Sequence, residues 1–150
     1  MPDAASASAP FDVRRIEALI EAHFPQIHAG ARTLVIEAVG PRSARVRMLS
    51  HDRHIRPGGT VSGPAMFTLA DFAVYVAIIA ALGEPGLEAV TTNLNINFLA
   101  KPEARDLIAS VRLIRLGRRL AVGEVEIHPE SGADMVAHAI ATYALPAPRP

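Results

Sequence analysis

The stretch PAMFTLADFAVYVAIIAAL, residues 64–82, decides the fold. Its only charged residue is Asp71, and it is nearly long enough to span a bilayer. An aspartate near the centre of a membrane helix costs roughly 2.5–3.5 kcal/mol on insertion scales, and no basic cluster flanks this stretch. Because the stretch is apolar on every side, it predicts a helix buried on every side of a globular domain, without contact to a membrane.

The segments on either side of this helix carry other periodicities. Apolar residues recur at spacings of three and four over residues 11–24, which predicts an amphipathic helix that ends before Pro25. The last strand has Ala137, Ala139 and Ala141 on one face, which leaves room for a helix to lie against it. The order of one helix, two strands, the buried helix and four strands favours an α+β fold with an antiparallel sheet wrapped on that helix. The predicted strands are residues 34–38, 44–49, 93–98, 107–116, 120–128 and 135–145.

The composition fits a single domain, residues 11–150, preceded by a flexible tail at residues 1–10. Fifteen basic and fifteen acidic residues cancel, which argues against disorder and against a nucleic-acid partner. The chain has no cysteine, which excludes disulfides and thiol nucleophiles. Because the tail has neither the basic nor the apolar segment of a signal peptide, we expect a cytoplasmic protein.

Asp71 is the candidate functional residue of the long helix. An unpaired buried charge is costly, so such a carboxylate normally finds partners or neutralises. One interpretation is structural, with Asp71 reaching water or capping a neighbouring loop. The other is a general base or nucleophile in an apolar pocket.

The sequence Ser62-Gly63-Pro64 marks the start of the helix. Ser62 and Pro64 are typical of a helix cap and a first turn. The free N–H groups of such a start can also bind an oxyanion or a phosphate. Gly63 and Asp71 are eight residues apart, about 12 Å along a helix axis, which is too far for one chain to place both on one carbonyl group. If the two residues share a site, the second must come from another copy of the chain, which predicts a two-fold dimer.

Three stretches together resemble a known family: RPGGTVSGPAMFTLADFAVYVAI (56–78), AVTTNLNINFLAKP (89–102) and RLIRLGRRLAVGEVEI (112–127). They resemble the hot-dog-fold acyl-coenzyme A (acyl-CoA) thioesterases of the phenylacetate-pathway (PaaI-like) type. The resemblance implies a curved antiparallel sheet wrapped around a long central helix, here with an extra N-terminal helix. It also implies homodimers whose sheets join edge to edge, often paired into tetramers.

The resemblance further implies hydrolysis of the acyl-CoA thioester to free acid and coenzyme A, without a cofactor, because coenzyme A is part of the substrate. Asp71 falls on the catalytic carboxylate, as general base or nucleophile. Gly63 falls on the glycine whose N–H polarises the carbonyl across the dimer interface. Thr91 or Thr92 falls near a hydroxyl that orients the water. Many members have His-Gly-Gly where this chain has Ser62-Gly63-Pro64, and Ser62 cannot act as an imidazole.

Two further sets of residues follow from the resemblance. Residues 93–98 and 117–122 fall on segments that line the coenzyme A channel, and Arg56 stands where many members have an asparagine. The expected acyl pocket could take a short aliphatic, a medium-chain or an aromatic acyl group. The candidate coenzyme A contacts are Arg56, Asn93, Asn95, Phe98, Gly117, Arg118 and Arg119, and the candidate pocket residues are Met66, Phe67, Phe72 and Tyr75.

Other functions have less support in the sequence. A non-catalytic acyl-CoA-binding or sensing module on the same fold is the main alternative, because the family histidine is replaced by Ser62. A purely structural protein has no positive feature beyond self-association. His51 and His54 lack a third ligand at a recognisable spacing, so we expect no metal site.

Overall fold

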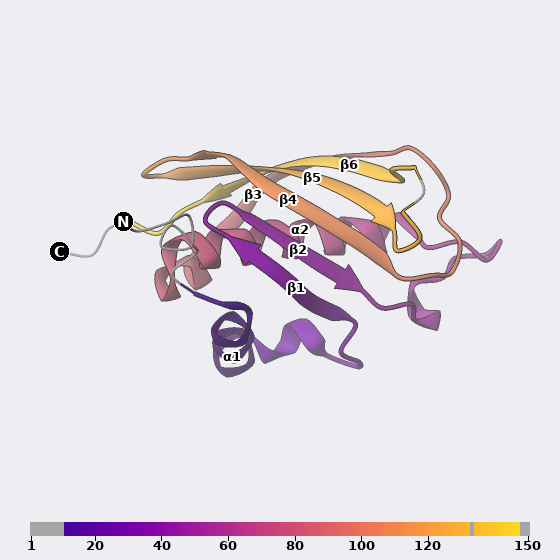
Figure 1. The fold of residues 1–150 in the computed structure, drawn as a ribbon, viewed down its shortest axis with the longest axis horizontal. Helices are drawn as coiled ribbons and strands as arrows, with labels where there is room; N and C mark the ends of the chain where they lie inside the picture. Colours follow the sequence, from indigo (N-terminus) through magenta and orange to yellow (C-terminus); the bar gives the residue numbers. More distant parts are fainter. Residues whose placement is uncertain (1–10, 133, 148–150) are drawn as a thin grey trace, which may run out of the picture.

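The computed structural model describes residues 11–132 and 134–147, and the predicted tail at residues 1–10 lies outside them. Six antiparallel strands form one curved sheet in the order β1-β2-β4-β5-β6-β3, and the long helix α2 lies along one face of it (Figure 1). This confirms the predicted hot-dog architecture with its additional N-terminal helix. The helices and strands are α1 (Val13–His23), β1 (Leu34–Gly40), β2 (Ser43–Met48), α2 (Gly63–Leu82), β3 (Val90–Phe98), β4 (Leu107–Leu116), β5 (Leu120–Pro129) and β6 (Ala137–Ala144). Three short 3₁₀ helices, which the periodicity did not indicate, connect them: η2 (Pro25–His28), η3 (Asp52–His54) and η4 (Glu84–Glu88).

Helix α2 begins and ends where its capping residues allow. The Ser62 hydroxyl accepts a hydrogen bond from the N–H of Ala65 at 3.3 Å, and Pro64 occupies the first turn. Gly83, with a φ of 78°, ends the helix in a conformation that glycine adopts without strain. Although α2 is long and apolar enough to cross a membrane, 72% of its most apolar window is buried, as in the core helix of a globular fold.

Small residues of the sheet let α2 pack closely against it. A Cβ atom at Gly123 of β5 would lie 3.0 Å from both γ-carbons of Val74 and 3.3 Å from a γ-carbon of Val111. The predicted alanine face of β6 is buried as well. Gly123 therefore has no room for a larger side chain, since protein interiors are close-packed.

Strand β3 lies at an edge of the sheet, and β6 is its only strand neighbour among the described residues. The pairing register shifts between Thr91 and Asn93, so one extra residue, Thr92, forms a β-bulge. The other long edge of β3 carries backbone groups that no strand of the described chain pairs.

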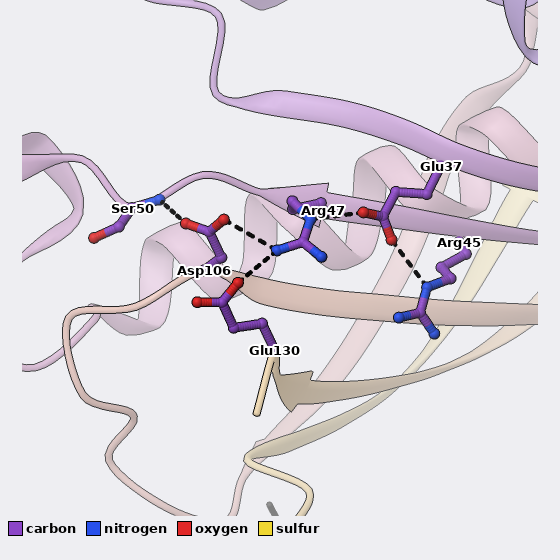
Figure 2. Close-up of polar contacts among 6 residues, drawn as sticks. All are labelled: Glu37, Arg45, Arg47, Ser50, Asp106 and Glu130. Carbon is purple, nitrogen blue, oxygen red and sulfur yellow. Dashed lines mark hydrogen bonds and ion pairs between the residues drawn. The ribbon is translucent and has the colours of Figure 1, made fainter. Parts of the chain in front are cut away.

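An ion-pair network joins the outer face of β1 and β2 to the segments that flank β4 and β5 (Figure 2). Arg47 lies at its centre and donates to Glu37 at 2.6 Å, to Asp106 at 3.1 Å and to Glu130 at 2.7 Å. Arg45 also donates to Glu37, at 2.9 Å. Hydrogen bonds from Arg47 and then Arg45 hold the pKa of Glu37 below its usual value.

Candidate active site

A cavity of about 930 Å³ lies between α2, the α1–η2 segment, η4 and the start of β3. The chain has five phenylalanines, two tyrosines and no tryptophan. Five of these aromatic residues line this one cavity, so its wall is mainly apolar. The aromatic lining residues are Phe24, Phe67, Phe72, Tyr75 and Tyr143.

One stripe of α2 faces the cavity. Phe67, Asp71 and Tyr75 are spaced by four residues, so they lie one above another on the helix surface, and all three line the cavity together with Phe72. Three of the four predicted pocket residues are therefore brought to Asp71. The fourth, Met66, is buried in the core and is not among the lining residues.

The half-buried Asp71 carboxylate finds two hydroxyl partners at the cavity wall. The Thr91 Oγ1 donates to Asp71 Oδ1 at 2.7 Å, and the Tyr143 hydroxyl lies 2.6 Å from the same oxygen. The Tyr143 hydroxyl also lies 2.9 Å from the backbone oxygen of Asp71. Within residues 11–132 and 134–147, both hydrogen bonds to this carboxylate end on Oδ1, so Oδ2 keeps its lone pairs for a further donor.

The bulge in β3 explains why Thr91 reaches the site. Thr91 is paired directly with Tyr143 across the β3–β6 register, so both side chains start from neighbouring points of the sheet. Leu94 lies on the inner face of the sheet. In a strand without a bulge, the period of two would therefore place Thr92 on the inner face and Thr91 on the outer one. The extra residue reverses this phase, and the Thr92 hydroxyl instead donates to the backbone oxygen of Thr142 at 3.1 Å. Of the two threonines that the sequence offered, the structure places Thr91 against Asp71.

Tyr143 is the residue of this site that the sequence analysis missed. It continues the buried face of Ala137, Ala139 and Ala141 by one more step of two residues, which is the signal that could have found it. Its ring stacks on that of Tyr75, with the centroids 6.3 Å apart and the planes at 21°. Burial, followed by the negative charge of Asp71, raises the pKa of Tyr143, so its phenol stays protonated and able to donate.

The start of α2 lies away from this carboxylate within one chain. The Ser62 hydroxyl makes the helix cap, as the structural interpretation predicted. Gly63 lies against the ring of Phe98, since a Cβ at position 63 would be 3.2 Å from Phe98 Cζ. Gly63 and Asp71 lie on the same helix, separated by about 12 Å of helix rise.

The predicted coenzyme A contacts lie outside the cavity lining, in three places. Arg56 and Phe98 lie near the start of α2, where an Arg56 Nη1 donates to the backbone oxygen of Pro57 at 3.2 Å. The exposed Arg118 and Arg119 lie in the β4–β5 turn with Gly117. Leu120 pairs with Ala144, which pairs with Val90, so this turn is at the same end of the sheet as the cavity. Asn93 and Asn95 are exposed along β3.

A metal site has no support in the described part of the chain. The rings of His51 and His54 lie 5.9 Å apart, and no group of three or more histidine and acidic side chains that could hold a metal ion occurs among those residues.

Comparison with known proteins shows the family of the chain. A model of the thioesterase superfamily matches residues 58–136. The chain belongs to the thioesterase superfamily. The matched residues contain α2, β3 and therefore Asp71, Gly63 and Thr91, whereas Tyr143 lies beyond them.

Individual relatives agree with this assignment. A proposed esterase of Pseudomonas aeruginosa is 32% identical over 106 residues, which cover 70% of this chain and 77% of that protein. The crystal structure of a proposed thioesterase from Silicibacter sp. TM1040 is 41% identical with a TM-score of 0.81, and the match covers 93% of this chain and 95% of that one. A proposed thioesterase from Ralstonia eutropha JMP134, described as phenylacetic acid degradation-related, is 29% identical with a TM-score of 0.68, covering 75% of this chain and 84% of that one. Membership of the thioesterase superfamily implies a hydrolase that acts on thioesters, and it confirms the predicted resemblance.

Proposed function

We propose that this thioesterase-superfamily protein hydrolyses acyl-CoA thioesters, with Asp71 as the general base. The observation that carries the proposal is the Asp71 carboxylate, which is bound on one oxygen by two hydroxyls and borders an apolar cavity of about 930 Å³. A cavity of this size and lining suits an acyl group, because ligand pockets are mainly apolar with a few placed polar groups.

The reaction needs one water molecule. Asp71 takes a proton from the water while the water oxygen attacks the thioester carbonyl carbon. The carbon–sulfur bond then breaks. The acyl group leaves as the free acid, and the coenzyme A sulfur takes up the proton. General-base catalysis by a positioned carboxylate typically contributes 10²–10⁴-fold to the rate. A direct attack by Asp71 on the carbonyl is the alternative role of the same group.

The oxyanion donor is the Gly63 N–H of a second copy of the chain. The first N–H groups of a helix have no hydrogen-bond acceptor within the helix, and they lie at the positive end of the helix dipole. They therefore suit a developing negative charge. One such donor is worth roughly 2.7–4 kcal/mol of transition-state stabilisation where it has been measured.

The position of β3 supports a dimer that brings these groups together. Thr91 lies at the start of β3, beside Asp71, and Phe98 lies at its end, beside Gly63. If the open edge of β3 pairs with its own copy in antiparallel fashion, the two strands run in opposite directions. Gly63 of one copy then approaches Asp71 of the other, which one chain alone cannot achieve.

Coenzyme A itself would lie along the outside of this interface. Arg118 and Arg119 are exposed at the cavity end of the sheet and suit phosphate recognition through their planar guanidinium groups. Arg56, Asn93, Asn95 and Phe98 would contribute from the other copy. The proposal also includes that the protein acts in the cytoplasm.

The test is a panel of acyl-CoA thioesters of different chain length and aromaticity, with detection of the released thiol. Asp71→Asn is expected to lose at least about 100-fold in kcat while remaining dimeric in size-exclusion chromatography. Asp52→Asn, the same change at an exposed position in η3, is the matched control and should keep the wild-type rate. An Asp71→Asn variant that retains most of its turnover would disprove the general-base assignment.

A non-catalytic acyl-CoA-binding module is the second candidate. It is favoured by one observation: the Ser62 hydroxyl, at the family's histidine position, is engaged in the helix cap. Tight binding of acyl-CoA in isothermal titration, with no thiol released across the whole panel, would support this function over hydrolysis.

A further inference from the structure

We propose that Tyr143 is a positioning residue that holds the Asp71 carboxylate with Oδ2 free for the attacking water. The inference rests on the general-base role proposed for Asp71. It concerns a residue that lies beyond the part of the chain matched by the superfamily model.

Tyr143 contacts Asp71 at two points. Its hydroxyl lies 2.6 Å from the side-chain oxygen Oδ1 and 2.9 Å from the backbone oxygen of the same residue. The single phenolic proton favours the charged oxygen, because charge-assisted hydrogen bonds are the stronger ones. A group that touches both the side chain and the backbone of Asp71 restricts the rotation of the carboxylate relative to α2.

Thr91 completes the restraint from the neighbouring strand. It donates to the same Oδ1 at 2.7 Å and is the direct cross-strand partner of Tyr143. Two donors on Oδ1 leave Oδ2 as the oxygen with full accepting capacity. The pair therefore decides which carboxylate oxygen can take a proton from water.

Tyr143 is itself held rigidly enough to position another group. It is buried in β6, which lies between β5 and β3, and its ring stacks on Tyr75. The Tyr75 hydroxyl in turn donates to the backbone oxygen of Leu87 at 2.7 Å. Catalytic geometry depends on such support, since side chains locked by packing and hydrogen bonds hold a reacting group in place.

The test compares Tyr143→Phe with Tyr75→Phe. Each change removes one hydroxyl from the same stacked pair, but only the Tyr143 hydroxyl contacts Asp71. A displaced catalytic group can cost about 10²-fold in rate. We expect Tyr143→Phe to lower kcat by about 10- to 100-fold with KM changed less than about 3-fold. Tyr75→Phe, which loosens the pocket wall at Leu87, is expected to act mainly on KM.

The outcomes separate this inference from the proposed function. Full turnover in Asp71→Asn would overturn the proposed function and this inference with it. If Asp71→Asn is inactive but Tyr143→Phe loses no more kcat than Tyr75→Phe, the inference is wrong and the proposed function stands.

A structural readout tests the inference without a substrate. Tyr143→Phe is nearly isosteric, and its thermal denaturation checks that the fold is kept. In its crystal structure we expect the Asp71 side chain to change rotamer or to split into two conformers. An Asp71 carboxylate that is ordered as in the wild-type protein, with Thr91 alone on Oδ1, would overturn the positioning role.

Discussion

Replacing Arg47 by methionine tests whether the network on the outer face of the sheet stabilises the fold. Methionine keeps an unbranched aliphatic stem and removes the guanidinium group with its charge and its donors. The change leaves Glu37, Asp106 and Glu130 without the cation that they share. We expect a loss of stability that no single exposed salt bridge would produce.

The magnitude follows from the exposure of the three partners. Exposed ion pairs contribute 0–1 kcal/mol, and hydrogen bonds to charged groups contribute up to about 3 kcal/mol when less exposed. The side chains of Arg47, Glu37 and Asp106 are 24%, 26% and 22% exposed, whereas Glu130 is 42% exposed and adds less. We therefore expect Arg47→Met to cost about 2–3 kcal/mol in the free energy of unfolding, or about 5–10 °C in Tm for a chain of this size.

The assay is thermal and urea unfolding at pH 7, with Arg112→Met as the matched control. Arg112 lies on the same face of the sheet, but its side chain is 69% exposed, and among the described residues it pairs with Glu124 alone, at 3.1 Å. Its replacement should move Tm by no more than about 1–2 °C. The reasoning would be refuted if Arg47→Met and Arg112→Met lowered Tm equally.

The same variant makes a prediction about pH. The pKa of Glu37 is lowered in the folded protein, chiefly by Arg47, so its contribution is present above the unfolded value of about 4.3 and is lost as the pH falls through the folded value. The difference in stability between wild type and Arg47→Met should therefore be complete at pH 7 and become smaller below about pH 4. A difference that stayed constant down to pH 3 would contradict this electrostatic origin.

Two further predictions concern packing and capping. Gly123→Val should destabilise the fold by about 1–3 kcal/mol, because its Cβ would already be 3.0 Å from Val74, and the double variant with Val74→Ala should recover part of the loss in urea unfolding. Additive losses in that double variant would show that the two side chains do not collide. Ser62→Ala should cost about 1 kcal/mol by removing the cap on the Ala65 N–H, whereas Ser62→Asp should keep the stability. If Ser62→Ala loses thiol release but no stability, Ser62 acts in the reaction and not as a cap.

The elements that position Asp71 could be predicted because their signals are local. A lone charge in residues 64–82 is visible in the sequence, as are the helix start at Ser62 and the alternation in the later strands. The distance along the helix then separates Gly63 from Asp71 without any knowledge of the sheet. These inferences need only the fixed rise of a helix and the period of a strand.

The partners of Asp71 depend on strand pairing and could not be predicted in the same way. Alternation alone cannot show that Thr92 is an extra residue, and without the bulge the choice between Thr91 and Thr92 stays open. The alternation that places Ala141 on the buried face could also have predicted that Tyr143 is buried. Its contact with Asp71, however, depends on the β3–β6 register. Two of the partners of Arg47, Asp106 and Glu130, are likewise distant in sequence and meet it only through the sheet.

The position of β6 in the sheet also determines when, during synthesis of the chain, the site around Asp71 can form. β6 follows β3, β4 and β5 along the chain, yet it is inserted between β5 and β3. While the chain is being synthesised, β3 therefore has no neighbouring strand of its own chain until β6 emerges, and the segment between them, which contains β4 and β5, must first bring the two strands together. Until then Thr91 has no partner strand to place it, and Tyr143 has not yet been made. A nascent chain, or a fragment cut before β6, would carry Asp71 without Tyr143 and without the strand that holds Thr91 against it.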